Sequence, residues 1–181
     1  MTNVVQAIET VKRAMPDASF GLRALVVAIG GLESTWGDGF PGTNNWGAIT
    51  KGSGWTGPTF EHEDSRWTPT GVEHYTTEFR AYSTPDEGAS DLGRLLKSQY
   101  SKAVAAAESG SWPAVSRLLY EGGYYTGIKP KKEAIADHYK RLREFLVEQG
   151  ISAPMLAASA GLEWLFWGAI GAFFWLRRKR K

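Results

Sequence analysis

Apolar residues recur every three or four positions near the start of this chain, which is the spacing that places side chains on one face of an α-helix. One such face comprises Val4, Ile8, Val11 and Met15, and a second comprises Leu22, Leu25, Val26, Ile29 and Leu32. The first helix should end near Pro16, because proline breaks helices, and the second should begin after Ser19, a good capping residue. The pattern therefore predicts two amphipathic helices in succession.

The helical spacing is lost from Gly37 to about Gly71, where glycine, threonine, asparagine, tryptophan and proline become frequent. Short strands are predicted at Trp46 to Thr50 and around Val72 to Arg80. This part of the chain should therefore form a loop-rich lobe with a small sheet.

Helical signals return at Thr84-Pro85-Asp86-Glu87, in which the threonine and the glutamate have the spacing of a capping box. The helix that begins there should run to about Tyr100. Two further helices are predicted near Pro113 to Tyr120 and from about Lys131 to Gln149, and Gly150 should cap the last one.

These elements predict an α+β domain over residues 1–150, with a mostly helical body and a small β lobe. The rest of the chain has a different character. Residues 155–176 contain one ionisable residue, Glu163, and residues 177–181 are all lysine or arginine.

The apolar segment is long enough to cross a membrane. Its 22 residues span roughly 33 Å at ~1.5 Å each, compared with about 30 Å for a hydrocarbon core. We therefore expect one C-terminal transmembrane helix at 155–176, joined to the domain by a short hinge at 151–154. The basic tail at 177–181 suits lipid phosphates. The alternative is an apolar helix packed inside the domain.

The net charge of +2 averages these two unlike parts. Five of the 21 basic residues and one of the 19 acidic residues lie beyond residue 150, so residues 1–150 carry a net charge of −2. That part lacks the basic stripe of a nucleic-acid-binding domain, so nucleic acid is not an expected partner. Cysteine is absent, which excludes disulfides and thiol catalysis. The first residues lack the apolar core of a signal peptide, so export by such a signal is not expected.

Glu33 is the main candidate for acid chemistry. It lies near the end of the second predicted helix, with Ile29 one turn before it and Trp36 one turn after it. Apolar surroundings disfavour an ionised carboxyl group, and a general acid must keep its proton near neutral pH. Neighbouring glycines predict open space for a bulky polymer; they are Gly30, Gly31, Gly37 and Gly39. The alternative is a helix-end carboxylate in solvent.

Four short motifs follow one another in a characteristic order. They are Glu33-Ser34-Thr35-Trp36-Gly37, Asn44-Asn45-Trp46-Gly47-Ala48-Ile49-Thr50, Phe79-Arg80-Ala81-Tyr82 and Gly123-Tyr124-Tyr125-Thr126. Together they resemble the motif series of the glucosaminidases of glycoside hydrolase family 73, which are peptidoglycan hydrolases related to the lysozyme-like lytic transglycosylases. The resemblance covers roughly residues 20–130. It implies a lysozyme-like fold and cleavage of peptidoglycan glycan strands without a cofactor.

The same resemblance implies roles for individual residues. Glu33 matches the general acid, and Tyr124 matches a tyrosine that faces it. The turn that borders the substrate groove in the family is matched by Asn44, Asn45 and Trp46. Tyr82 and Tyr125 are further candidates for sugar contacts, because aromatic rings stack on pyranose faces. Such residues more often belong to a core.

Glycosidic cleavage also needs a group that meets the positive charge on the sugar, which is water, a carboxylate or the substrate's acetamido group. Glu61, Glu63 and Asp64 are candidate second carboxylates, and the sequence does not choose among them. Without a second carboxylate, a lytic transglycosylase is the alternative, since one acid/base residue suffices there. A non-catalytic glycan-binding membrane protein of the same fold is another.

His62 stands among these carboxylates, but it does not predict a metal site. Neighbouring residues of a strand face opposite sides, and no second histidine has ligand spacing. We expect a solvated acidic turn there instead.

The side of the membrane on which the domain lies is left open. Basic residues favour the cytoplasmic side, which would place residues 1–150 outside. A span that ends five residues before the C-terminus inserts after synthesis, which favours leaving the domain where it was made. We expect a single-pass protein of a host cell membrane or of a virion membrane, where it would help to breach a wall on entry. The oligomeric state is not predicted.

Overall fold

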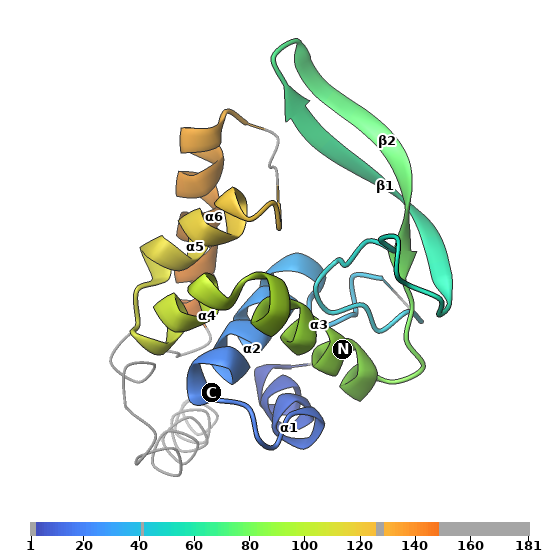
Figure 1. Cartoon of the computed structure of the whole chain (residues 1–181), viewed down its shortest axis with the longest axis vertical. Helices are drawn as coiled ribbons and strands as arrows, with labels where there is room; N and C mark the ends of the chain where they lie inside the picture. Colours follow the sequence, from blue (N-terminus) through green and yellow to red (C-terminus); the bar gives the residue numbers. More distant parts are fainter. Residues whose placement is uncertain (1–2, 41, 126–128, 149–181) are drawn as a thin grey trace, which may run out of the picture.

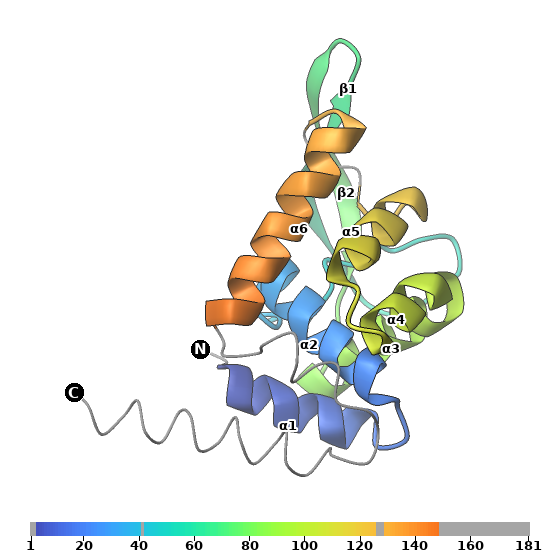
Figure 2. The same ribbon diagram turned by 90° about the vertical axis from the view of Figure 1, so that its left-hand side faces the viewer.

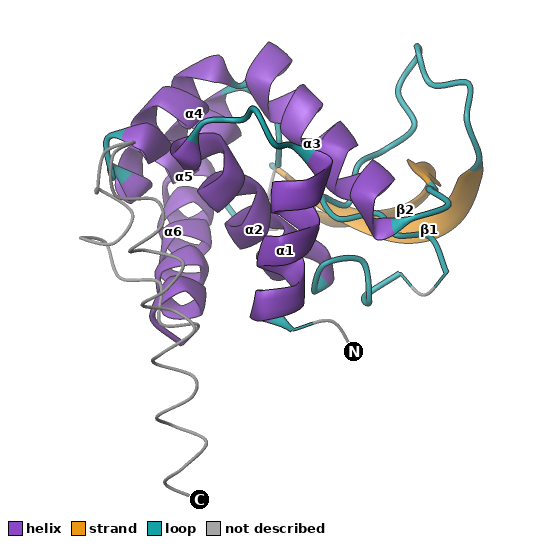
Figure 3. Cartoon of the chain, turned by 90° about the horizontal axis from the view of Figure 1, so that it is seen from below, coloured by secondary structure: helices purple, strands orange, loops and turns teal. Residues whose placement is uncertain are grey.

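Helices and one hairpin make up the part of the chain that the computed structural model describes, residues 3–40, 42–125 and 129–148. In order these elements are α1 (Val4–Ala14), α2 (Phe20–Ser34), β1 (Thr59–Thr68), β2 (Gly71–Arg80), α3 (Pro85–Gln99), α4 (Ser101–Glu108), α5 (Trp112–Glu121) and α6 (Lys131–Glu148). The helices form one body, and the two strands form a hairpin that projects from it (Figures 1 and 3). The predicted α+β architecture with a small β lobe is confirmed.

The central helix of the body is α2. Residues 25–30 are all buried, so the helix is covered on every side. It packs against α1, α3, α4 and α6, and Figure 2 shows α6 flanking it. A helix that is apolar all round needs cover all round, and α2 is therefore a fixed base for the residues at its C-terminal end.

The helix ends follow the predicted capping signals. The Ser19 hydroxyl accepts a hydrogen bond from the Leu22 N–H at 3.3 Å. The Thr84 hydroxyl accepts one from the Glu87 N–H at 3.3 Å, and the Glu87 carboxylate accepts one in return, which completes the capping box. The sequence pattern misses α4, because its run of small residues has no face of large apolar side chains.

The hairpin pairs β1 with β2 in antiparallel register, with Phe60 opposite Phe79. The ring of Phe40 packs against both, with centroids 5.4 Å from Phe60 and 5.7 Å from Phe79. The strand predicted at 46–50 is wrong, since only Thr50 forms an isolated bridge, to Phe79. The pattern misses β1, because most of its residues are polar and none is fully buried.

The predicted membrane anchor lies outside the described residues, as do the hinge at 151–154, the basic tail at 177–181 and the Gly150 cap. Among the helices that are described, none combines the length and the apolar character needed to cross a bilayer.

Candidate active site

Glu33 lies in the last turn of α2, one residue before the helix ends. Its side chain is 21% exposed, whereas its Oε1 atom is buried and has no hydrogen-bond partner among the described residues. The carboxyl group therefore has one sheltered oxygen and lies only partly open to solvent. The alternative of a helix-end carboxylate in free solvent does not describe this position.

A tight reversal follows Glu33. Thr35 and Trp36 both have left-handed backbone angles, with φ of 51° and 56°, a conformation that costs side-chain-bearing residues about 1–3 kcal/mol. The Trp36 indole N–H donates to the Val27 carbonyl at 2.9 Å, which folds the ring back onto α2. The strained turn is thus held by burial of a large aromatic ring beside the acid.

Ser34 connects α2 to the loop that carries the second motif. Its hydroxyl donates to the Trp46 carbonyl at 2.6 Å and accepts from the Gly37 N–H at 2.9 Å. Both atoms are buried. The serine next to the acid is therefore a structural residue that holds two motif segments together.

The Asn-Asn-Trp loop is anchored from within. The Asn45 amide donates to the carbonyls of Ile49 and Arg80 at 3.0 and 2.9 Å, and Asn45 and Trp46 have no exposed surface. The Asn44 amide donates to the Tyr82 carbonyl at 2.9 Å. Asn45 and Trp46 therefore shape the loop from inside, and the substrate-binding role expected of this turn stays a prediction.

The glycines near Glu33 permit close packing and do not leave open space, which corrects the sequence-based expectation. A β-carbon on Gly30 would lie 2.8 Å from the Trp46 ring, and one on Gly31 would collide with the Phe145 ring. The rings of Trp36 and Phe145 also pack together, with centroids 5.6 Å apart. Aromatic side chains have filled the space that the small residues provide.

Tyr124 reaches the same loop from the segment after α5. Its hydroxyl donates to the Gly47 carbonyl at 2.9 Å. Burial raises the pKa of Tyr124 well above its ordinary value, and the negative charge of Glu33 raises it further. The phenol therefore stays protonated and lies within the electrostatic reach of the acid.

Tyr125 introduces a residue that the sequence interpretation missed, His138. Their rings stack in parallel, with centroids 4.1 Å apart and planes 15° apart, and the Tyr125 hydroxyl donates to the Ser116 carbonyl at 2.9 Å. Burial, followed by the charge of Glu33, raises the pKa of Tyr125. The His138 Nε2 atom lies 3.7 Å from Glu33 Oε1.

A sequence signal for His138 does exist. The buried residues of α6 are Ala134, His138, Leu142 and Leu146. They recur every four positions, so the histidine occupies one place in an otherwise apolar stripe. A polar residue in such a stripe needs a buried partner.

The hairpin carboxylates have partners away from Glu33. Asp64 accepts from the Tyr75 hydroxyl at 3.0 Å, Glu63 lies 3.5 Å from His74, and Glu61 is exposed opposite Glu78. The choice among the three candidates thus stays a prediction. Across residues 3–40, 42–125 and 129–148, no group of acidic, histidine or cysteine side chains could hold a metal ion.

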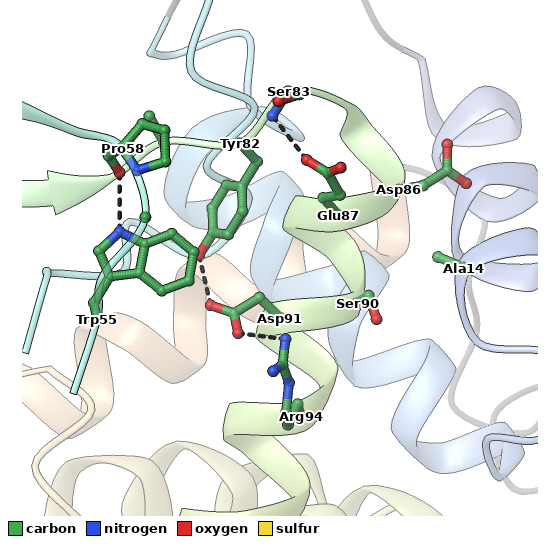
Figure 4. A pocket seen from close by; sticks show the side chains of 12 residues that line it. Ala14, Trp55, Pro58, Tyr82, Ser83, Asp86, Glu87, Ser90, Asp91 and Arg94 are labelled. Carbon is green, nitrogen blue, oxygen red and sulfur yellow. Dashed lines mark hydrogen bonds and ion pairs between the residues drawn. The ribbon is translucent and has the colours of Figure 1, made fainter.

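Tyr82 lies beside a pocket of about 450 Å³ that Glu33 does not line (Figure 4). Its hydroxyl donates to Asp91 at 2.6 Å, and Asp91 also pairs with Arg80 at 2.8 Å. Trp55 packs edge-on against the Tyr82 ring. Tyr82 is therefore committed to a buried polar network, and its predicted sugar contact stays a prediction.

The fold is similar to solved structures of peptidoglycan hydrolases. A mutant of the peptidoglycan hydrolase from Sphingomonas sp. A1 is 26% identical with a TM-score of 0.57, and the match covers 80% of this chain and 97% of that one. The truncated glycoside hydrolase domain of FlgJ from Salmonella typhimurium is 22% identical with a TM-score of 0.51, over 80% of this chain and 93% of that one. The catalytic domain of the autolysin Auto from Listeria monocytogenes is 17% identical with a TM-score of 0.54, and the match covers 82% of this chain and 80% of that one.

Neither a protein-family model nor a curated protein sequence matches the chain. The likeness therefore rests on the arrangement of the elements and on the moderate identity to the Sphingomonas enzyme. The expected resemblance to glycoside hydrolase family 73 is confirmed at the level of the fold. This chain has the fold of the glycoside hydrolase domains that act on peptidoglycan.

Proposed function

We propose that this chain is a glycosidase that cuts the sugar backbone of bacterial peptidoglycan, with Glu33 as the proton donor. One observation carries the proposal: the Glu33 carboxyl has a buried Oε1 atom on a side chain that is 21% exposed. Such a group can present its other oxygen to a substrate. Cleavage of a glycosidic bond requires a carboxylic acid that protonates the leaving oxygen, and the proteins with a similar fold include a glycoside hydrolase domain and a peptidoglycan hydrolase.

Tyr124 assists in this proposal by holding the Asn-Asn-Trp loop against the acid. Its hydroxyl is bonded to Gly47 at 2.9 Å, and Ser34 is bonded to Trp46 at 2.6 Å from the other side. The loop beside Glu33 is therefore fixed at two neighbouring residues. A catalytic group needs such support, because small displacements from the productive geometry reduce the rate strongly.

A lytic transglycosylase is the second candidate. One observation favours it: two of the candidate second carboxylates have their described partners within the hairpin, where Asp64 accepts from Tyr75 at 3.0 Å and Glu63 lies 3.5 Å from His74. In a transglycosylase the 6-hydroxyl of muramic acid attacks within the substrate, so a second carboxylate is not needed. The products distinguish the two reactions.

The test is an analysis of digested cell walls by mass spectrometry. The full chain in mild detergent is incubated with purified sacculi beside Glu33→Gln and a control, Glu144→Gln, which changes an exposed carboxylate on α6. The wild-type chain and the control should release muropeptides, while Glu33→Gln should release none and keep its fold. Released muropeptides with reducing ends would identify a hydrolase. Released muropeptides with anhydromuramic ends would identify a transglycosylase. Intact glycan after incubation with the wild-type chain would overturn the proposed enzymatic activity. The alternative of a glycan-binding protein would then remain.

We further propose that residues 155–176 anchor the enzyme in a lipid bilayer, in a host cell membrane or a virion membrane. The support is the sequence alone: 22 residues with one ionisable side chain precede five basic ones. An anchor would hold a wall-cutting domain close to the membrane that lies beneath the wall. A virion would use such an enzyme to pass the wall during entry.

A further inference from the structure

His138 is a buried histidine that faces the proposed acid. It is 2% exposed and lies on the apolar stripe of α6. Its Nε2 atom and Glu33 Oε1 are 3.7 Å apart, and neither atom has a hydrogen-bond partner among the described residues. Buried polar atoms without partners are rare in folded proteins, and here two of them point at each other.

Ser116 determines how the imidazole is oriented. Its hydroxyl is fully buried and lies 2.9 Å from His138 Nδ1. A carboxylate oxygen can only accept hydrogen bonds, so the tautomer that would pair His138 with Glu33 is the one with the proton on Nε2. In that tautomer Nδ1 accepts the Ser116 hydroxyl proton.

The ring is also held in plane. Tyr125 stacks on it with a centroid distance of 4.1 Å, and the Tyr125 hydroxyl is fixed to the Ser116 carbonyl. The titratable groups that face His138 are Glu33 from α2 and Tyr125 from the segment after α5, while Ser116 from α5 is uncharged. Glu33 is therefore the one acidic group with a described interaction with the imidazole.

We propose that His138 is a positioning residue for Glu33, whose Nε2–H holds the buried Oε1 atom so that Oε2 carries the catalytic proton. This inference rests on the function proposed above. The separation of 3.7 Å is longer than a hydrogen bond. A small rotation of the partly exposed Glu33 side chain closes it, as catalytic contacts tighten when substrate binds.

In the proposed reaction Glu33 first donates a proton and later regains one. Glu33 Oε2 gives its proton to the glycosidic oxygen as the bond from that oxygen to the sugar carbon breaks. The carboxylate that forms is stabilised by the Nε2–H of His138. Water or the substrate's own hydroxyl attacks the sugar carbon and returns a proton to Glu33. The contact strengthens as charge develops on Glu33, so it should act mainly on kcat.

Two substitutions separate this role from packing. His138→Asn keeps an amide near Ser116 but is too short to reach Glu33, whereas His138→Gln places an amide donor near the position of Nε2. Turnover is measured from pH 4 to 9 on soluble, uncrosslinked peptidoglycan strands with the full chain in detergent. Leu142→Val, one turn further along α6 and fully buried, is the packing control.

His138→Asn should lower kcat about 10- to 100-fold with KM nearly unchanged, because the acid loses its orientation. The pH at which activity falls on the alkaline side should move upward, because the carboxylate loses a hydrogen-bond donor. His138→Gln should recover most of the rate and the original alkaline limb. Leu142→Val should leave the rate and the alkaline limb of the pH profile unchanged.

Wild-type kinetics in His138→Asn would overturn the positioning role and leave the proposed function standing. Equal losses in His138→Asn and His138→Gln with an unmoved alkaline limb would also overturn it, because they would indicate packing alone. If the wild-type chain leaves peptidoglycan uncut, the proposed function fails first, and the inference fails with it.

Discussion

The hydroxyl of Ser34 donates a hydrogen bond to the backbone carbonyl of Trp46 at 2.6 Å. This bond joins the residue after Glu33 to the loop that carries the second motif, 12 positions further along the chain. Both partners are buried, so water cannot replace the bond. The first two motifs are therefore one structural unit, in which a short side chain fixes the distance between the helix end and the loop.

Replacing Ser34 by alanine should destabilise the domain by about 1–3 kcal/mol, because the Trp46 carbonyl and the Gly37 N–H lose a buried partner. Chemical denaturation gives the change in the free energy of unfolding. Ser98→Ala, which removes an exposed hydroxyl bonded within α3, should change it by less than about 0.5 kcal/mol. Equal stabilities of the two variants would show that the Ser34 bond contributes nothing specific.

Replacing Tyr124 by phenylalanine should lower the turnover of peptidoglycan about 10- to 100-fold, because the loop at Gly47 loses its tie to the segment that faces Glu33. Release of muropeptides at saturating substrate measures the change. Tyr139→Phe removes a half-buried phenol from α6 and should leave turnover unaltered. Wild-type turnover in Tyr124→Phe would show that the Tyr124 hydroxyl does not contribute to catalysis.

Stability should fall at alkaline pH. Burial, and then the bond to Asp91, raises the pKa of Tyr82 above its ordinary value. The folded state keeps this proton above about pH 10, while the unfolded state loses it, so each pH unit above that point costs about 1.4 kcal/mol for this residue. The stabilisation is thus complete below about pH 10 and is lost as the pH rises further.

The variant Tyr82→Phe isolates that contribution. The free energy of unfolding of this variant should be lower than that of the wild type at neutral pH, since Asp91 loses a donor. Above about pH 10 it should decline less steeply than that of the wild type, and the two slopes should differ by about 1.4 kcal/mol per pH unit. Denaturant midpoints at pH 9, 10 and 11 measure both slopes. Parallel curves for the two chains would contradict the role of Tyr82.

The full chain should float with lipid vesicles in a density gradient, whereas a chain without residues 151–181 should stay at the bottom. Leu165→Arg, which places a charge in the middle of the predicted span, should weaken flotation, because a charge at the bilayer centre costs at least about 2.5 kcal/mol. Flotation of the truncated chain would show that the described domain itself binds lipid.

Local chemistry made much of the fold predictable. The capping residues Ser19 and Thr84 act on amides within three positions, so their spacing alone marks where α2 and α3 begin. The strand β1 escaped prediction because its stability comes from pairing with β2 and from Phe60 against Phe79. A polar strand of this kind has no local signature.

The motif order likewise pointed to Glu33 as the acid, but it did not indicate what surrounds that residue. Glycines that suggested open space proved to be packing sites for aromatic rings, because the partners that fill them come from distant segments. Phe145 of α6 covers Gly31 of α2, for example. Small residues allow either outcome, and only the approach of another element decides.

The sequence by itself determined the helices with strong caps and the hairpin's second strand, since these depend on residues close together in the chain. It also singles out Glu33 as the candidate acid, which stays a prediction. Only the tertiary structure decided that His138 faces Glu33 at 3.7 Å. The two residues lie on different helices, and the packing of α6 against α2 brings them together. Along the chain His138 is one polar residue in an apolar stripe, and its closeness to Glu33 becomes visible only in the folded structure.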